Sequence, residues 1–247
     1  MVTEMIPIRR VVTGNDERGQ SKVVWDGPAP NAQSGSMGGS GHTDLWVWYD
    51  TPASIFGDRD DGNLPYDFPG PATGGHLRVV QGGGRPPNYD PSKDTLAVPP
   101  HEPKPRPSRR ISDRGGNNVY SSAMHKTETI DYGILLTGER ELILDDSKLM
   151  MRPGDIVVQV GAWYQWSATQ GTQMAFDMFS AGFVDGPVGL AQGNDAVVRA
   201  DSLELPEGVK PARRIVTIDT EPNKSILVSD GPAPDVRTDP ARSHGQR

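Results

Sequence analysis

The stretch that decides the fold runs from residue 125 to residue 168 and reads HKTETIDYGILLTGERELILDDSKLMMRPGDIVVQVGAWYQWSA. Two apolar runs, 134–136 and 142–144, flank a short segment at 137–139 that contains a glycine. Short apolar runs on either side of such a turn are typical of a β-hairpin. We therefore expect the two runs to pair with each other as antiparallel strands.

Polar side chains alternate along the first part of this stretch. His125, Thr127, Thr129 and Asp131 are spaced two residues apart. On an extended strand they share one face, because successive side chains point to opposite sides. A polar stripe on a half-buried strand lines either solvent or a cavity.

The spacing of these residues resembles that of the cupin superfamily. The first cupin motif has a His, a second His two residues later, an acidic residue four further on and a Gly seven beyond that. Here these places hold His125, Thr127, Asp131 and Gly138. The resemblance implies an all-β fold, a cupin-like barrel of the double-stranded β-helix or jelly-roll type.

The second cupin motif, a Gly-Asp strand followed by a turn with a His and then an Asn, resembles residues 154–168. Tyr164 stands where the His is expected, and Ala168 stands where the Asn is expected. The two motifs together cover about a fifth of the chain. They are more specific for a fold than for a chemistry.

The composition favours the same fold class. The 247 residues include 29 Gly and 23 Pro, and the hydrophobic content of 34% is concentrated between residues 130 and 190. Many turns and one short core region are typical of all-β proteins. We expect a hairpin arm and flexible loop at 1–39, the barrel at 40–185, a segment with a second hairpin at 186–235 and a mobile polar tail at 236–247, with a short helix near 190–198.

An internal repeat supports the two hairpins. The β-prone runs at 8–13 and 22–25 end in DGPAP at 26–30, and the same passage recurs at 212–217 and 224–228, with DGPAP at 230–234. The copies are either equivalent edge elements that clasp the barrel or a partner subunit, or the second opens a further cupin unit that the chain no longer contains. Because uncovered strand edges recruit further strands, we expect a homodimer in which the hairpins take part.

Charge and the terminal sequence exclude some partners. The net charge of −7 and the lack of a block dense in Lys and Arg argue against binding of nucleic acid. The chain has no cysteine, which rules out disulfides and thiolate chemistry. The first residues contain no apolar run long enough for a signal peptide or membrane span, so we expect a cytoplasmic protein without a membrane partner.

The resemblance raises the question of a metal. Metal-binding cupins hold their ion with imidazoles and a carboxylate. Here Thr127 and Tyr164 occupy two of the four ligand places, and a threonine hydroxyl is a poor ligand for a divalent transition metal. We therefore expect no cofactor; if a divalent metal is present, His125 and Asp131 would be its ligands.

Without a metal, the same residues form an acid/base set. His125 has an unperturbed pKa of about 6.5, and a neighbouring Asp131 would favour its protonated form. Tyr164 can donate a hydrogen bond to a carbonyl or a developing enolate. We predict that His125, Asp131 and Tyr164 catalyse dehydration, isomerisation or cyclisation of a small carbonyl or hydroxy compound.

Aromatic residues supply a candidate binding wall. Trp163, Trp166 and Phe176, together with Thr127, are expected to contact a largely apolar small-molecule ligand, although the aromatics would serve equally well as core packing. Two other functions stay open at this point. One is a metal-dependent cupin oxygenase, and the other is a ligand-binding or regulatory cupin without catalysis.

Overall fold

The computed structural model describes residues 4–35, 39–55, 60–63, 70–106, 110–169, 171–183, 212–221 and 224–233. The expected helix near 190–198 and the tail at 236–247 lie outside these ranges. Within them the chain is all-β, as expected, with sixteen strands and two single-turn 3₁₀ helices. None of the described helices has the length and apolar character needed to cross a lipid bilayer.

The strands and 3₁₀ helices are numbered in the order in which they follow one another along the chain. Their bounds are β1 (Arg9–Asn15), β2 (Ser21–Pro28), β3 (Asn31–Ser34), β4 (Gly41–Trp48), η1 (Asp61–Asn63), β5 (Gly75–Gly83), η2 (Pro91–Lys93), β6 (Lys104–Pro105), β7 (Ile111–Asp113), β8 (His125–Thr127), β9 (Thr129–Thr137), β10 (Arg140–Ile143), β11 (Lys148–Met151), β12 (Ile156–Val160), β13 (Gln165–Ala168), β14 (Gly171–Ser180), β15 (Arg213–Glu221) and β16 (Lys224–Pro232).

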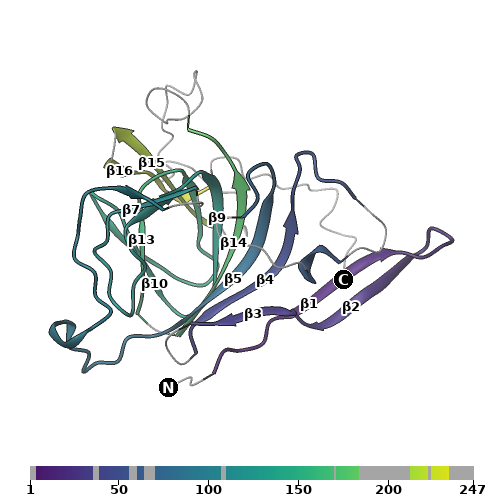
Figure 1. Ribbon diagram of the computed structural model, residues 1–247, viewed down its shortest axis with the longest axis horizontal. Helices are drawn as coiled ribbons and strands as arrows, with labels where there is room; N and C mark the ends of the chain where they lie inside the picture. Colours follow the sequence, from purple (N-terminus) through teal and green to yellow (C-terminus); the bar gives the residue numbers. More distant parts are fainter. Residues whose placement is uncertain are drawn as a thin grey trace, which may run out of the picture.

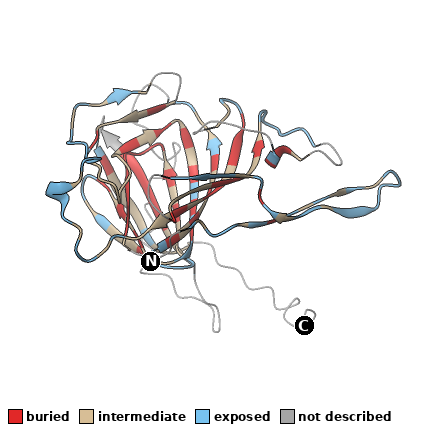
Figure 2. Ribbon diagram, turned by 60° about the horizontal axis from the view of Figure 1, so that its bottom comes forward, coloured by how far each residue is buried: buried red, intermediate tan, exposed pale blue. Residues whose placement is uncertain are grey.

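Two walls enclose a barrel (Figure 1). The main wall is an eight-stranded sheet in the order β16-β15-β12-β9-β14-β5-β4-β3, antiparallel except for the parallel pair β12–β15. The opposite wall is the three-stranded sheet β11-β10-β13, which a backbone bridge between His125 and Tyr164 joins to the small sheet β6-β7-β8. Buried residues concentrate on the strands of these two walls (Figure 2).

The expected hairpin at 134–144 is wrong. β9 pairs with β12 and β14, whereas β10 pairs with β11 and β13, so the two runs lie in different sheets. Gly138 marks the point where the chain passes from one wall to the other. Its φ is +75°, and a Cβ there would lie 2.2 Å from the carbonyl oxygen of Gly171. The turn therefore requires glycine, but it connects two sheets instead of two paired strands.

Large apolar side chains fill the space between the walls. Leu135, Leu142, Met151 and Met174 are fully buried and belong to one cluster. These residues alternate with more exposed neighbours along their strands, which is the period of two that a sheet with one buried face requires. The same cluster includes Tyr164, so the core and the polar stripe of the sequence meet inside the barrel.

The repeated hairpins form as expected, but their surroundings differ. β1–β2 projects from the body of the molecule and leaves Val11 and Val23 exposed (Figures 1 and 2). β15–β16 extends the main sheet through the pairing of β15 with β12, and Ile215 and Val216 are buried there. The same local sequence thus supports a hairpin in both places, whereas its packing depends on what lies beside it.

Candidate functional site

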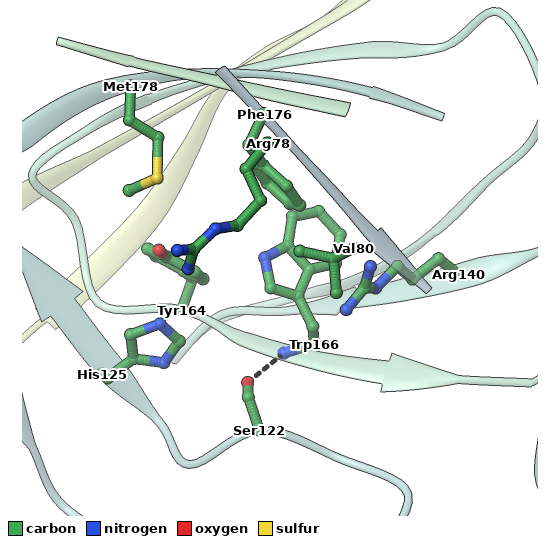
Figure 3. A pocket seen from close by; sticks show the side chains of 9 residues that line it. All are labelled: Arg78, Val80, Ser122, His125, Arg140, Tyr164, Trp166, Phe176 and Met178. Atoms are coloured by element: carbon green, nitrogen blue, oxygen red, sulfur yellow. Dashed lines mark hydrogen bonds between the residues drawn. The ribbon is translucent and has the colours of Figure 1, made fainter. Parts of the chain in front are cut away.

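A cavity of about 200 Å³ lies between the two walls of the barrel (Figure 3). The main wall contributes Phe176 and Met178 of β14 and Arg78 and Val80 of β5. Arg78 and Phe176 are directly opposite each other in the β5–β14 pairing. Cross-strand neighbours of this kind point to the same side of a sheet, so both face the cavity.

His125 and Tyr164 lie side by side on the opposite wall because their backbones form an antiparallel bridge. The N–H of each residue donates to the carbonyl oxygen of the other at 2.9 Å. Directly opposed residues project to the same face, and the two ring centroids are 4.4 Å apart. The bridge thus brings one residue of each sequence motif together at the cavity wall.

The hydrogen bonding of His125 assigns its tautomer. Its Nδ1 is 2.7 Å from the carbonyl oxygen of Ala123, and a carbonyl can only accept, so Nδ1 carries the proton. The other ring nitrogen, Nε2, is left as an acceptor and points toward Tyr164 and Arg78 (Figure 3).

Burial keeps His125 neutral. It is the largest influence on the imidazole and lowers the pKa of His125 to about 4. The carboxylate that partly opposes this effect is that of Asp113. The expectation that Asp131 favours the protonated form of His125 is therefore wrong. At neutral pH the ring presents a lone pair to the cavity.

Asp131 lies at the hydroxyl end of Tyr164 and does not line the cavity. Its Oδ2 accepts a hydrogen bond from Tyr164 Oη at 3.3 Å, while its buried Oδ1 has no hydrogen-bond partner in the described structure. Burial raises the pKa of Asp131 to about 7, which hydrogen bonds from Thr129 and Tyr164 only partly offset. A protonated Asp131 can donate to Tyr164 Oη, which leaves the tyrosine proton for a ligand in the cavity.

Tyr164 keeps its proton at neutral pH. Burial raises the pKa of Tyr164 well above its ordinary value, and a hydrogen bond with Thr127 offsets this only in part. Thr127 is buried, and its hydroxyl lies 2.5 Å from that of Thr129. The polar stripe of the sequence therefore faces the interior, with His125 at the cavity and the threonines near the hydroxyl end of the tyrosine.

The aromatic candidates separate into two groups. Trp166 and Phe176 line the cavity with their rings edge to face, 5.8 Å between centroids. Trp163 lies elsewhere, because neighbouring residues of an extended chain point to opposite sides. Its ring lies beneath the guanidinium of Arg114 at 4.6 Å and the ammonium of Lys126 at 5.3 Å, and it does not line the cavity.

Two arginines that the motif comparison did not find, Arg78 and Arg140, line the cavity. Arg78 is directly opposite Asp44 in the β4–β5 pairing, and its Nε donates to Asp44 Oδ1 at 2.5 Å, with both side chains buried. Arg140 begins β10, and its guanidinium lies 5.2 Å from the ring centroid of Trp166. The period of two along Arg140, Leu142 and Leu144 was the available signal, because it puts Arg140 on the buried face.

No counter-charge for Arg140 is found among the residues that the structure describes. The side chain is 9% exposed, and its Nε and Nη1 have no hydrogen-bond partner among the described residues. No carboxylate in the described ranges forms an ion pair with it. Burial lowers the pKa of Arg140 to about 10, so the guanidinium is still charged at neutral pH.

The donor set does not fit a metal centre. In the part of the chain that the structure describes, no group of three or more His, Cys, Asp or Glu side chains is placed to hold an ion. Of the two candidate ligands, His125 lines the cavity and Asp131 does not. The charged guanidinium of Arg140 in the same cavity would repel a cation.

A second hollow, of about 510 Å³, meets the first at Ser122 and His125. The segment that precedes β8 contributes most of its lining, including Arg106 and Asp113, which form an ion pair at 2.5 Å. His125 therefore stands where the two hollows join.

No model of a known protein family matches the chain. Its curated relatives include a cupin-domain-containing oxidoreductase of Neurospora crassa, 39% identical over 80 residues, which are 32% of this chain and 40% of that protein. A second oxidoreductase of that description, from Hypocrea virens, is 46% identical over 46 residues, 18% of this chain and 24% of the relative. Phomopsin biosynthesis cluster protein D of Diaporthe leptostromiformis is 49% identical over 47 residues, again 18% and 24%.

The matched segments thus span between about a quarter and two fifths of the relatives' own length. Among solved structures, the cupin domain of Cnp3 from Schizosaccharomyces pombe superposes with a TM-score of 0.30 at 11% identity, over 71% of this chain and 89% of that domain. A superposition this loose supports no conclusion about activity.

Proposed function

We propose that this member of the cupin superfamily is a small-molecule enzyme that performs acid/base chemistry in the barrel cavity. Its barrel and the descriptions of its relatives indicate the superfamily. The observation that carries the proposal is the backbone bridge that holds His125 and Tyr164 together at the cavity wall. One residue offers a lone pair and the other a proton. General acid and base groups placed in this way accelerate reactions by about 10²–10⁴-fold.

The chemistry that suits this pair is proton transfer next to a carbonyl group. His125 Nε2 takes a proton from the carbon beside the carbonyl, and the electrons of the broken C–H bond form an enolate. Tyr164 stabilises the charge on the enolate oxygen by donating a hydrogen bond. Return of the proton to another carbon completes an isomerisation, and its transfer to a departing hydroxyl completes a dehydration.

Asp131 is a positioning residue in this scheme. It holds the hydroxyl end of Tyr164 by the hydrogen bond of 3.3 Å and does not touch the cavity. In its protonated form it donates to Tyr164 Oη, so that the tyrosine proton is directed at the ligand.

Exchange of carbon-bound hydrogen with deuterated water tests the proposal. A panel of small 3-hydroxy and unsaturated carbonyl compounds is incubated with the protein, and the loss of proton signals is followed by NMR. We expect at least one compound to exchange, and we expect His125→Gln and Tyr164→Phe each to slow the exchange by about 100-fold or more.

Matched controls come from residues outside the cavity. His101→Gln and Tyr132→Phe make the same chemical changes at positions that do not line it, and both should exchange at the wild-type rate. The proposal fails if no compound exchanges, or if the cavity variants match these controls.

A second candidate, an oxidoreductase, is favoured by the descriptions of two relatives. Elemental analysis of the purified protein, together with dioxygen uptake in the presence of the same panel, decides between the candidates. Near-stoichiometric iron, manganese, nickel or zinc that is lost in His125→Ala would favour the oxidoreductase.

A further inference from the structure

Arg140 differs from the other well-buried arginines of the described structure. A buried charge is unfavourable unless it is paired, and one without a partner destabilises the fold. The other two arginines that are buried in the described structure follow this rule, through the ion pairs Arg10–Asp60 and Arg78–Asp44. In the described ranges no carboxylate pairs with Arg140, although its side chain is more than nine-tenths buried and lines the cavity.

The missing counter-charge identifies the ligand chemistry. The planar guanidinium matches a carboxylate in two parallel hydrogen bonds, and such bonds are about twice as strong as neutral ones. Arg78 reaches the same cavity, but Asp44 already balances its charge. The cavity therefore has one positive charge to balance, which suits a monoanion better than a dianion.

The other residues that line the cavity indicate the shape and polarity of the rest of the ligand. The rings of Trp166 and Phe176 lie next to each other on one side of the Arg140 guanidinium, with centroids 5.2 and 6.0 Å from it, and Met178 and Val80 add apolar surface. Flat apolar groups pack well against aromatic rings of this kind. A cavity of about 150 Å³ binds benzene, so about 200 Å³ admits one ring or a short unsaturated chain together with a carboxylate.

We propose that Arg140 binds the carboxylate of the substrate, and that the substrate is a small monocarboxylate with a flat, apolar body. The inference rests on the proposed use of the cavity as the substrate site, but not on the type of reaction. Figure 3 shows Arg140 and His125 on opposite sides of Trp166. A carboxylate at Arg140 therefore leaves the other end of the molecule at His125 and Tyr164, so the reacting carbon is several bonds from the anchor.

Calorimetric binding of matched pairs of compounds tests this assignment. Benzoate and trans-cinnamate are compared with benzamide and cinnamamide, which have nearly the same shape and no charge, on the full chain. We expect the carboxylates to bind about 10- to 100-fold more tightly than the amides, as a charge-assisted pair predicts.

The variants locate the effect. Arg140→Gln should remove the preference for carboxylates and leave amide binding within about threefold, whereas Arg140→Lys should keep part of it because the charge remains. Arg152→Gln is the matched control, since the side chain of Arg152 is 71% exposed, and it should bind like the wild type. Circular dichroism and thermal unfolding establish that each variant is folded.

The outcomes separate this inference from the proposed reaction. Equal binding of carboxylates and amides, or unchanged carboxylate affinity in a folded Arg140→Gln, overturns the assignment and leaves the acid/base proposal standing. Carboxylate binding through Arg140 without deuterium exchange in any compound supports the assignment and counts against the reaction. Failure of all four compounds to bind overturns the assignment together with the use of this cavity.

Discussion

Two buried arginines face one cavity from opposite walls, and in the described part of the chain a carboxylate pairs with one of them and not with the other. Arg78 on β5 is held by Asp44 at 2.5 Å in the adjacent strand, whereas Arg140 on β10 lies beside the rings of Trp166 and Phe176 and has no ion pair among the described residues. A paired buried charge belongs to the scaffold. An unpaired one lowers stability until a ligand supplies the opposite charge, so the contrast separates a structural arginine from a functional one.

The largest expected effect on stability comes from breaking the buried Arg78–Asp44 ion pair. Asp44→Asn removes the carboxylate that pairs with the buried Arg78 guanidinium, and loss of one partner of such a pair lowers the free energy of unfolding by about 3–5 kcal/mol. Urea unfolding measures the change. The exposed pair Arg9–Asp26 offers a control, since Asp26→Asn should leave unfolding unaltered. A similar result for both variants would contradict the structural role of Arg78.

The second expected effect is a loss of stability at low pH that comes from His76, a buried neighbour of Arg78. His76 is buried, and burial, with added repulsion from Arg78 and His42, lowers the pKa of His76 to about 3. The unfolded chain takes up this proton below pH 6.5 and the folded chain only near pH 3, so stability falls as the pH falls through that window.

His76→Gln removes this contribution. The free energy of unfolding of the variant should improve relative to the wild type by about 2–3 kcal/mol between pH 7 and pH 4.5. Urea unfolding of both proteins across this range measures the difference. If the difference in free energy of unfolding between the two proteins stayed constant with pH, burial would not keep His76 neutral in the folded protein.

The smallest expected effect concerns Arg140, and its sign is opposite to that of Asp44→Asn. Arg140→Met replaces a buried charge by an apolar side chain of similar length, so we expect the free energy of unfolding to stay the same or to rise by about 1 kcal/mol. The same substitution should remove the preference for carboxylate ligands. A loss of stability as large as that of Asp44→Asn would mean that both arginines support the fold.

Local features of the sequence predicted much of this structure. The period of two from His125 to Asp131 placed these residues on one face, which the structure shows to be buried, and the repeated runs formed hairpins in both places, because such properties depend on neighbouring residues. The partners of β9 and β10 were predicted wrongly, since the choice of sheet depends on strands far away in the chain. Gly138 has the same backbone requirement in a crossing between walls as in a hairpin turn.

The chemistry of the site was less accessible from the sequence. The low pKa of His125 follows from the depth of its burial, which a strand pattern does not give. Arg140 lies outside the motif positions, and the Arg78–Asp44 pair forms between different strands. The separation of Trp163 from Trp166 was predictable. Trp166 is two residues from Tyr164 and points to the same side of an extended chain, whereas Trp163 is one residue away and points to the opposite side.

The most direct test of the account is the pKa of a bound ligand's own carboxyl group. Benzoate labelled with ¹³C at the carboxyl carbon is followed by NMR against pH in the saturated complex. Pairing with Arg140 predicts a pKa below the value of the same compound in water, and Arg140→Gln should raise it above that value, because burial alone favours the neutral acid. A bound carboxyl whose pKa in the wild-type protein equals or exceeds its value in water would contradict the account.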